Sequence, residues 1–492
     1  MARECSLPPS ASSLSESLRD LGYSLETAIA DLIDNSISAR ANFIEILCDL
    51  SQSDPALAII DNGRGMTADE LFAAMRHGST SPKQPRAQGD LGRFGLGLKT
   101  ASFSQCRRLT VISAQKGIRS GAEWNLDLID RRDDWIVTIL EDDEIAELPF
   151  SDRIGDSGTV VIWRTMDRLF EDESGRKRDE IVNEKLDVVD RHLSLVFHRF
   201  LAGQVRGRKK LSISINGHEL EPFDPFCLKN STTQILPEET VRVSGTPVHM
   251  QPYILPHHNR LTASEYNFYQ DRSDFISNQG AYIYRNSRLM AWGDWFRLIP
   301  KGEATKLARV QIDFPTSLDE SWTIDIRKSR AKPPRAVRER LRQIITRIAG
   351  RSTTVHRGRG RKLFEETKAP MWERYADQDR IRYALNGKHP LVEALRGGLE
   401  NDTGQKLDLL LETVSAALPV EMIYSDYSIH PRQVKQSDMD RDAVIERLAA
   451  LKNALFHDND CTAEHFREVM RSTRLFEDHL DIAEEFIQEV LT

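Results

Sequence analysis

The sequence predicts an α/β fold, in which a mixed sheet is backed by helices, followed by a second α/β domain and a helical C-terminal region. Two patterns predict the first domain. Over residues 12–41, apolar side chains recur at spacings of three and four, which is typical of a helix. The apolar runs 43–50 and 57–60 that follow have the length of buried strands. Because the chain has 492 residues, more than one domain is expected.

The composition is that of an ordinary globular protein, with 40% hydrophobic residues, 29% charged residues and a formal net charge of -8. No stretch approaches the roughly 18 uncharged apolar residues that a membrane span needs. The first twelve residues lack the basic and apolar blocks of a secretory signal. The five cysteines are scattered without a CxxC pair, which argues against a zinc site and a disulfide framework. We therefore expect a cytoplasmic protein without a membrane partner.

The first domain is expected to span residues 1–174. Its opening helix should break at Gly22 and resume near Ser24. Residues 77–97 are rich in Gly, Ser, Pro and Lys and show no periodicity, which predicts a long loop of the kind that is often functional. A helix at 98–104 is expected to follow the loop. Further strands are predicted at 109–113, 122–127, 135–140 and 159–165.

The second α/β domain is expected over residues 175–350, a basic linker over 351–379 and a helical, acidic region over 380–492. Within the second domain the patterns predict helices, strands and one hairpin. The expected elements are a helix at 183–201, strands at 211–215 and 308–314, a hairpin at 281–290, a loop at 321–328 and a basic helix at 336–348.

The first motif that can carry chemistry is Ala30-Asp31-Leu32-Ile33-Asp34-Asn35 on the early helix. Asp31 and Asn35 are four residues apart and so share one helix face. A carboxylate and a carboxamide placed this way can serve an attacking water and a hydrated Mg²⁺, which takes oxygen ligands and keeps several waters. The alternative is a solvated polar face that carries an Asp and an Asn by chance.

The second motif is Asp61-Asn62-Gly63-Arg64-Gly65-Met66, directly after the apolar strand 57–60. A carboxylate at a strand end can accept a hydrogen bond from the exocyclic amine of adenine. Gly63 and Gly65 would let the backbone approach the base without a Cβ in the way. The alternative is a tight turn, since Asp-Asn-Gly is favourable turn chemistry.

The third motif is Gly92-Arg93-Phe94-Gly95-Leu96-Gly97, which precedes the predicted helix at 98–104. Glycine-rich backbone that leads into a helix N-terminus presents N–H groups and a positive dipole end to phosphates. A loop precedes the motif, so neither a Rossmann fingerprint nor a P-loop fits. Lys99, in the first turn of the helix, is a further candidate phosphate contact, with a solvated lysine as the alternative.

All three motifs occur in order within about 70 residues, and the set resembles the GHKL ATPase superfamily of gyrase, heat-shock chaperones, histidine kinases and MutL. The resemblance implies the Bergerat α/β sandwich, with ATP and Mg²⁺ bound on its helical side. By this resemblance Asn35 would bind Mg²⁺, Asp61 the adenine amine and the Gly92–Gly97 backbone the phosphates. Gly63, Gly65 and Met66 belong to the matching adenine motif, and Thr159, after Gly158, resembles the Gly-Thr that completes the adenine pocket.

The chain departs from the family at Asp31, where the MutL, gyrase and microrchidia types usually carry Glu. That residue is the general base for the attacking water. Asp reaches one methylene less far, and a base must come within hydrogen-bond distance of its proton, directly or through one water. The resemblance therefore predicts ATP binding more firmly than turnover, and predicts that hydrolysis is slow or that Asp31 acts through an additional water.

The second domain indicates which members of the superfamily the chain resembles most. Trp322-Thr323-Ile324-Asp325-Ile326-Arg327-Lys328-Ser329 resembles the loop by which an S5-like transducer domain delivers a lysine to the γ-phosphate, and Lys328 would be that residue. Arg327 and Arg330 are neighbouring alternatives, and a basic loop without this role is the other interpretation. The hairpin at 281–290 resembles the transducer hairpin of microrchidia-like proteins and is assigned no catalytic role. Prokaryotic microrchidia/MutL-type ATPases are the best match.

Charge and helix patterns suggest partners. Between residues 327 and 362 Glu339 is the single acid, so this basic segment could bind DNA without sequence preference, or it could be a solvated helix and linker. The C-terminal helices are expected to bind a protein partner or a second copy. The resemblance implies an ATP-gated homodimeric clamp on DNA or DNA-associated complexes, in repair or in defence against foreign DNA. The alternative is a chaperone-like or regulatory ATP switch that acts on protein partners without DNA.

Overall fold

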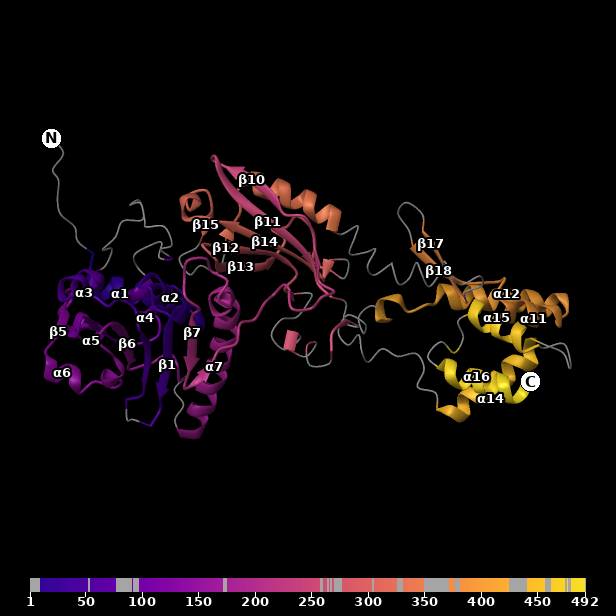
Figure 1. Cartoon of the computed structure of the whole chain (residues 1–492), viewed down its shortest axis with the longest axis horizontal. Helices are drawn as coiled ribbons and strands as arrows, with labels where there is room; N and C mark the ends of the chain where they lie inside the picture. Colours follow the sequence, from indigo (N-terminus) through magenta and orange to yellow (C-terminus); the bar gives the residue numbers. More distant parts are fainter. Residues whose placement is uncertain are drawn as a thin grey trace. The chain divides into compact units, whose positions relative to one another are not determined.

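The computed structural model divides into two compact units, residues 1–352 and 353–492, whose elements are labelled in Figure 1. The structure describes residues 9–51, 54–76, 91, 97–170, 175–256, 260–262, 265, 268–269, 277–302, 305–324, 331–348, 371–376, 381–423, 440–455, 462–473, 476 and 479–491.

The first unit contains an eight-stranded mixed sheet, called the first sheet, with the strand order β5-β4-β3-β6-β2-β1-β7-β8. Only the β1–β7 pair is parallel; the other neighbours run antiparallel. The strands are β1 (Phe43–Asp49), β2 (Ala56–Asp61), β3 (Arg108–Gln115), β4 (Ile118–Asn125), β5 (Val137–Leu140), β6 (Gly158–Arg164), β7 (Ser212–Ile215) and β8 (His218–Glu219).

The helices of this part agree with the predicted break. Gly22 has a φ of 72°, and it separates the first helix from the second. The helices are α1 (Ala11–Arg19), α2 (Leu25–Ser38), α3 (Ala68–Met75), α4 (Gly97–Phe103), α5 (Leu126–Arg132), α6 (Asp142–Ala146), α7 (Gly175–Val196) and α8 (His198–Leu201). The sequence pattern did not indicate α3 and α5, and α7 begins eight residues before the predicted helix.

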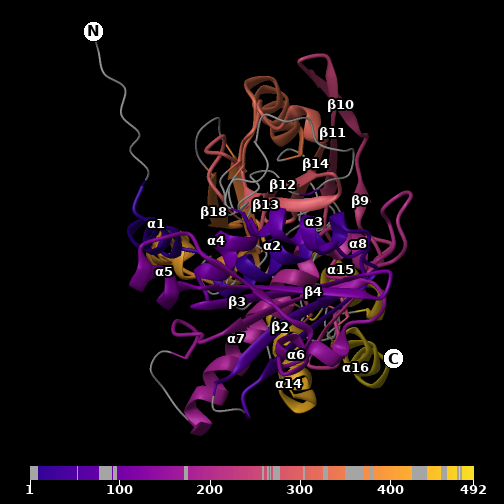
Figure 2. The same cartoon turned by 90° about the vertical axis from the view of Figure 1, so that its left-hand side faces the viewer.

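The alternation of side chains along each strand gives the first sheet two apolar faces. On β2, Leu57 and Ile59 belong to the larger core, together with buried residues of α2, α4 and α7. Ala58 and Ile60 point to the opposite face, where a smaller core includes Ile145 of α6. In Figure 2, α2, α3 and α4 lie on the face of the first sheet that is turned toward the strands β12 (Gly280–Arg285) and β13 (Arg288–Asp294).

These last two strands belong to a six-stranded second sheet with the order β10-β11-β14-β12-β13, in which β9 also pairs with β11. The hairpin predicted at 281–290 is β12–β13, and the strand predicted at 308–314 is β14. A helix over residues 335–348 buries its apolar side chains in the core of this sheet. The remaining strands are β9 (Gln234–Ile235), β10 (Glu239–Val243), β11 (Thr246–Ile254) and β14 (Ala308–Phe314), and a separate small pair is formed by β15 (Thr323–Ile324) and β16 (Ala331–Lys332).

The first sheet extends past residue 174, where the sequence places the end of the first domain, because β7 and β8 complete it at Glu219. An antiparallel pair, β17 (Trp372–Ala376) and β18 (Ile381–Leu385), opens the described part of the second unit and was not predicted. Helices form the rest of that part, as expected: α11 (Pro390–Gly397), α12 (Asn401–Ala416), α14 (Arg441–Leu455), α15 (Ala463–Thr473) and α16 (Leu480–Leu491). Within the described residues, no helix combines the length and the apolar character that crossing a membrane requires.

Candidate functional site

Three polar side chains form a row where β2, β6 and β3 lie side by side. Asp61 continues the Leu57 and Ile59 alternation of β2, so its side chain points to the helix-covered face of the first sheet. Thr159 of β6 pairs with Asp61 on one side and with Ser113 of β3 on the other. The Ser113 hydroxyl lies 3.2 Å from that of Thr159. The sheet thus presents a carboxylate and two hydroxyls, here called the strand-end row, to α2.

Asp61 is the charged member of the strand-end row, and its carboxylate is buried and held from two sides. The Ser36 hydroxyl, from α2, donates to Oδ2 at 2.7 Å, and the Gly63 N–H donates to Oδ1 at 2.8 Å. Burial raises the pKa of Asp61 above its ordinary value, although the hydrogen bonds from Ser36, Gly63 and the Thr159 backbone oppose the rise. Asp61 is therefore a buried, oriented hydrogen-bond acceptor.

The glycines beside the strand-end row are required by close backbone packing. Gly65 has a φ of +68°, and a Cβ at this position would lie 1.7 Å from the carbonyl oxygen of Ala114. Gly158 has a φ of +147°, and a Cβ there would lie 2.2 Å from the carbonyl oxygen of Asp61. Met66 follows directly and donates its N–H to the Ser113 hydroxyl at 2.9 Å. The turn after β2 is therefore fixed onto β3 and β6 without intervening side chains.

Helix α2 carries an unusual number of polar side chains into the core. Asp31, Asp34 and Ser36 are all buried, between apolar neighbours such as Ile33. Asn35 is exposed, although it lies between two of these buried residues. Buried carboxylates are costly unless they are paired or hydrogen-bonded, so each needs a partner. The buried polar residues of α2 therefore depend on specific partners elsewhere in the fold.

Asp31 brings α2 together with the start of α4. A Cβ placed on Gly97 would lie 3.5 Å from Asp31 Oδ2, so the first residue of α4 packs against this carboxylate. The Tyr23 hydroxyl donates to the same oxygen at 3.0 Å. Sequence reasoning missed Tyr23, because it lies in the break between α1 and α2, where helix-face arguments do not apply.

The approach to the glycine motif is tethered to α2. Leu91, the residue directly before Gly92, is buried and donates its N–H to the Ser38 hydroxyl at 3.2 Å. Gly92, Arg93, Phe94, Gly95 and Leu96 lie outside the described residues. Of the predicted phosphate-binding backbone the structure therefore places only Gly97, together with the Leu91 anchor.

Lys99 lies in the first turn of α4, as predicted, and its ammonium group is bound by backbone carbonyls. Its side chain is only 2% exposed, and its ammonium group donates to the carbonyl oxygens of Ala74 at 2.8 Å and Arg76 at 2.9 Å. Burial lowers the pKa of Lys99 to about 8. Lys99 thus closes the C-terminal end of α3, and the expected phosphate contact is not part of this geometry. Lys328 and its alternatives Arg327 and Arg330 lie outside the described residues.

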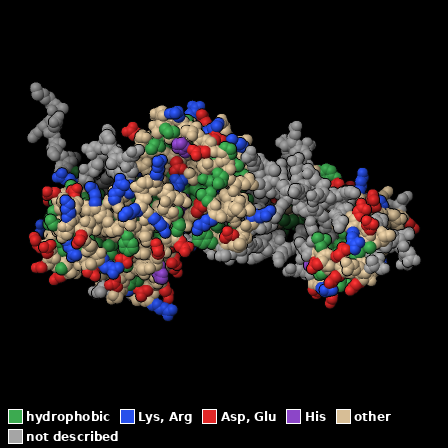
Figure 3. Space-filling view, viewed as in Figure 1, with side chains coloured by type: hydrophobic (Ala, Val, Ile, Leu, Met, Phe, Trp, Pro, Cys, Tyr) green, Lys and Arg blue, Asp and Glu red, His purple; other side chains and the backbone are tan. Residues whose placement is uncertain are grey.

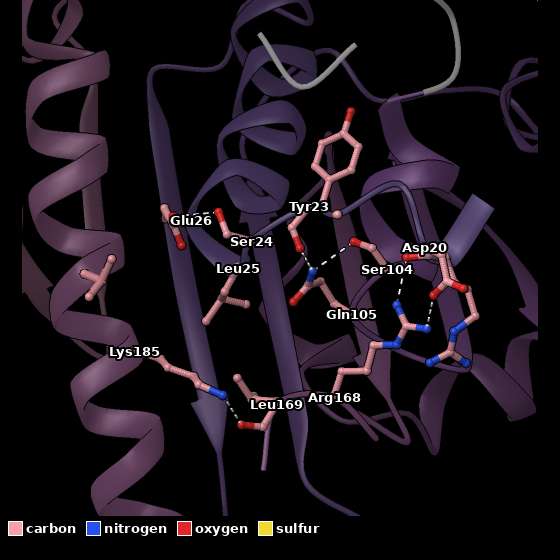
Figure 4. A pocket seen from close by; sticks show the side chains of 13 residues that line it. Asp20, Tyr23, Ser24, Leu25, Glu26, Ser104, Gln105, Arg168, Leu169 and Lys185 are labelled. Atoms are coloured by element: carbon pink, nitrogen blue, oxygen red, sulfur yellow. Dashed lines mark hydrogen bonds and ion pairs between the residues drawn. The ribbon is translucent and has the colours of Figure 1, made fainter. Parts of the chain in front are cut away.

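A cavity of about 510 Å³ opens at the N-terminal end of α2. Figure 4 shows its walls, where Gln105 donates to the Tyr23 carbonyl at 3.2 Å and Arg168 pairs with Asp20 at 2.7 Å. Lys185 reaches in from α7 and donates to the Leu169 carbonyl at 2.7 Å. None of the predicted site residues lines this cavity, and Tyr23 connects it to Asp31.

The structure thus brings together residues from motifs that are far apart in the sequence. Asp31 meets Gly97, and Asp61 meets Thr159 and, through Ser36, helix α2. Ser36 and Ser113 were not predicted as site residues. Strand alternation could have indicated Ser113, which follows Leu109 and Val111 at spacings of two.

Part of the chain that contains this geometry matches a known protein family. Residues 23–159 match the family described as histidine kinase-, DNA gyrase B-, and HSP90-like ATPase. The matched range contains every predicted site residue except Lys328.

Individual relatives match over short segments. The chain is 38% identical over 104 residues to the human (Homo sapiens) structural maintenance of chromosomes flexible hinge domain-containing protein 1, covering 16% of this chain and 5% of that protein. The Mus musculus protein of the same name is 36% identical over the same length and coverage. ATPase morc-1 of Caenorhabditis elegans is 31% identical over 93 residues, covering 19% of this chain and 10% of that protein. The chain therefore spans at most a tenth of the length of these relatives.

Proposed function

We propose that the chain binds and hydrolyses Mg²⁺-ATP, on the premise that residues 23–159, which match the histidine kinase-, DNA gyrase B-, and HSP90-like ATPase family, form an ATPase domain. The observation that carries the proposal is the convergence around α2. One side of this helix contacts Asp61 through Ser36, and another contacts Gly97 through Asp31. A single nucleotide lying along α2 would reach both groups.

The adenine end of the nucleotide is proposed to bind at the strand-end row. Asp61 accepts a hydrogen bond from the exocyclic amine of adenine, because its carboxylate is buried, is fixed by Ser36 and Gly63, and in its ionised form accepts hydrogen bonds without donating any. Gly65 and Gly158 add no side chain of their own beside this carboxylate, because a Cβ at either position would overlap neighbouring backbone. These residues fit a flat heteroaromatic base with an amine at its edge.

The phosphate end is proposed to lie between Asn35 and the start of α4. The donor set fits Mg²⁺, because Asn35 presents an exposed carboxamide on an otherwise buried stretch of α2, and Mg²⁺ prefers oxygen ligands. When bound, the ion would neutralise phosphate charge. Gly97 opens α4, and the backbone of Gly92–Gly97 is proposed to donate its N–H groups to the phosphates. Lys328 is proposed to contact the γ-phosphate from the second α/β domain.

Asp31 is proposed as the general base. It takes a proton from the water that attacks the γ-phosphorus, while the bond to the departing ADP oxygen breaks. The Tyr23 hydroxyl holds Oδ2 of this carboxylate, and Gly97, where a Cβ would be in van der Waals contact with Oδ2, adds no side chain beside it. Because Asp is shorter than Glu, we expect turnover to be slow.

The proposed biological action is that of an ATP-gated homodimeric clamp on DNA or DNA-associated complexes. Support comes from the relatives, one of which is named an ATPase, while two carry structural maintenance of chromosomes in their names. The basic segment 327–362 supports a contact with nucleic acid, since clustered Arg and Lys gain from counterion release on phosphate backbones.

One observation favours the alternative, a switch that acts on protein partners. In the helix over 335–348, Arg340 and Arg347 both pair with Glu239 of β10, and Arg335 pairs with Glu339 at 2.7 Å. These three arginines are thus partly neutralised by acids of their own helix and of β10. On the face of the molecule drawn in Figure 3, basic and acidic side chains are interspersed on the described parts of the first unit.

Binding of random-sequence DNA separates the two functions. The clamp predicts an electrophoretic shift that weakens steeply with salt and is lost when the arginines at 351, 357, 359 and 361 are neutralised. A chain that binds and hydrolyses ATP but gives no shift at low salt would instead favour the protein-directed switch.

Two substitutions on α2 test the proposed site itself. Asn35→Ala should abolish Mg²⁺-ATP binding, whereas Asp31→Ala should keep binding and slow phosphate release by about 10²–10⁴-fold. Asp31→Asn refines the second test, because it keeps an oxygen for the Tyr23 hydroxyl but cannot take a proton. Asn183→Ala, at an exposed asparagine of α7, is the matched control. Normal hydrolysis by both Asp31 variants would exclude this residue as the base.

A further inference from the structure

The tip of the β12–β13 hairpin places two arginines opposite each other. Arg285 and Arg288 are cross-strand partners on either side of a two-residue turn, in which Asn286 and Ser287 have φ values of 49° and 71°. Opposed residues of an antiparallel pair point to the same face, and like charges opposite each other are destabilising. Both side chains are nevertheless buried, with 1% and 4% of their surface exposed. Each guanidinium therefore needs its own compensating partner.

Arg285 joins three separate segments. Its Nε and Nη2 donate to the two carboxylate oxygens of Asp319, each at 2.7 Å, in a bidentate pair that fixes the guanidinium plane. Its Nη1 donates to the Leu91 carbonyl at 3.0 Å. Because the Leu91 N–H is bonded to Ser38 of α2, this one peptide segment is held by α2 and by the second sheet at once.

Arg288 reaches α2 directly. Its Nε donates to Asp34 Oδ1 at 3.3 Å, and both side chains are almost fully buried. His192 of α7 lies near this pair, and burial together with the charge of Arg288 lowers its pKa to about 3, so its ring stays neutral near pH 7. Asp34 is the residue next to Asn35, the proposed Mg²⁺ ligand.

A buried ion pair is a poor means of gaining stability, because the cost of desolvation offsets most of the attraction. Apolar side chains would hold two sheets together at least as well. The two arginines add hydrogen bonds that depend on direction. These bonds form only when the hairpin tip keeps its position relative to Asp34 and the Leu91 carbonyl. Movement of α2 or of the Leu91 segment therefore has to be shared by β12 and β13 or break these bonds.

We propose that Arg285 and Arg288 are positioning residues that transmit occupancy of the nucleotide site to the second sheet, through Leu91 and Asp34. This inference rests on the proposed function, since it needs a nucleotide on α2. It goes beyond that function by assigning the transmission to two residues of the hairpin, which act in addition to Lys328. Neither arginine touches the proposed nucleotide ligands, and each acts through a neighbour.

Hydrogen–deuterium exchange of the full chain, with and without Mg²⁺ and a non-hydrolysable ATP analogue, measures this transmission. In the wild type the analogue should slow amide exchange in α2 (residues 28–38) and also in the hairpin (residues 280–294). Coupling between sites commonly corresponds to about 5- to 150-fold, so slowing of at least about fivefold is expected in the hairpin. Arg285→Met and Arg288→Met should keep the protection of α2 and lose that of the hairpin.

A matched control distinguishes transmission from loss of a buried charge. Arg309 of β14 is equally buried, but its Nη1 donates to the carbonyls of Lys306 and Ala308, and its side chain also bonds Tyr282 of β12. Arg309→Met should therefore lower stability and speed hairpin exchange with and without the analogue, while the slowing that the analogue causes in both peptides stays. Asp319→Asn is a milder variant, which keeps Arg285 but removes the charge that orients it.

The outcomes separate the two proposals. Protection of α2 without any change in the hairpin of the wild type overturns the transmission and leaves the nucleotide site standing. Absence of protection in both peptides overturns the nucleotide site and the transmission together. Equal loss of hairpin protection in the Arg309→Met control would show that the arginines act only through stability. If the Met variants do not fold, the wild-type measurement and Asp319→Asn decide the question.

Discussion

The strand-end row of the first sheet and the arginine pair of the β12–β13 hairpin are both buried and polar, but they are built differently. In the row a single carboxylate, Asp61, is surrounded by hydroxyl and backbone donors. At the hairpin tip two full positive charges, Arg285 and Arg288, are each set against an Asp carboxylate. The first arrangement orients an acceptor toward a ligand, whereas the second fixes one part of the fold against another.

The difference shows how burial of polar groups can serve two purposes in one unit. A group that binds a ligand must keep some hydrogen-bonding capacity for that ligand. Its hydrogen bonds within the protein therefore fix its orientation without using all of its acceptor positions. Groups that transmit position need permanent partners on both sides. Substitutions in the row should therefore change affinity, and those at the hairpin should change coupling.

Among the substitutions that compare the row with the rest of this unit, Asp61→Asn should have the largest effect on nucleotide binding. It turns one of two acceptor oxygens into a donor, so that Gly63, Ser36 and the adenine amine compete for the oxygen that remains. Loss of a hydrogen bond to a charged group costs about 1.5–3 kcal/mol, which predicts ATP affinity weaker by about 10- to 150-fold, with little preference for adenine over guanine. Calorimetric titration measures this, with Asp54→Asn, at an exposed aspartate between β1 and β2, as the control. An unchanged affinity would remove Asp61 from the site.

The pH dependence of binding sharpens the same test. Because the pKa of Asp61 is raised, its carboxylate becomes protonated at a higher pH than an ordinary Asp, and ATP affinity should fall earlier on acidification. Asp61→Asn should lack this component. The sign for stability is opposite: the folded state binds the proton more tightly, so the contribution of Asp61 to stability decreases as the pH rises through this window.

Lys99→Met is expected to have an intermediate effect, on stability instead of affinity. The pKa of Lys99 falls from 10.5 to about 8 on folding, so the unfolded chain binds more protons between these values and stability should rise with pH. The rise should amount to about 2 kcal/mol between about pH 7 and pH 9.5. Denaturant unfolding across this range should show the rise in the wild type and in the exposed-lysine control Lys209→Met, and not in Lys99→Met. A strong loss of ATP affinity in Lys99→Met, with stability unchanged, would instead restore Lys99 as a phosphate contact.

Tyr23→Phe should have the smallest effect, confined to turnover. The Tyr23 hydroxyl holds Asp31, and loss of one such hydrogen bond is worth about 0.5–1.5 kcal/mol, or about 2- to 12-fold in kcat. KM should stay unchanged, because Tyr23 contacts the proposed base and not the proposed ligands. Tyr375→Phe, which removes a comparable tyrosine–carboxylate hydrogen bond in the second unit, is the control. A raised KM with normal kcat would place Tyr23 at the nucleotide instead.

Sequence patterns predicted the parts of this unit that depend on local periodicity. The break at Gly22, the β12–β13 hairpin and β14 were confirmed, because turn residues and apolar runs specify them directly. Gly65 and Gly158 could be singled out for the same reason: their motifs are short and contiguous. Ser36 and Tyr23 escaped notice, since their importance lies in contacts with Asp61 and Asp31 that the chain order does not reveal.

The role of Arg285 and Arg288 could not be predicted from local sequence patterns, because their partners are far away in the chain. Arg288 finds its carboxylate 254 positions away and Arg285 its carbonyl 194 positions away, across two sheets. From the sequence alone, two arginines beside a hairpin turn are expected to be exposed to solvent, and only the folded structure shows that they are buried. Lys99 shows a related limit, because its place in the first turn of α4 predicted a phosphate contact or a solvated side chain, whereas its ammonium group is buried against backbone carbonyls at the end of α3.

A crystal structure of the full chain with Mg²⁺ and a non-hydrolysable ATP analogue would show whether the proposed groups bind one nucleotide. We expect the adenine amine within hydrogen-bond distance of the Asp61 carboxylate, the metal at Asn35 and the terminal phosphate near Gly97 and Asp31. A nucleotide bound in the cavity at the N-terminal end of α2, or anywhere that leaves Asp61 and Asn35 without contact to it, would exclude the proposed site.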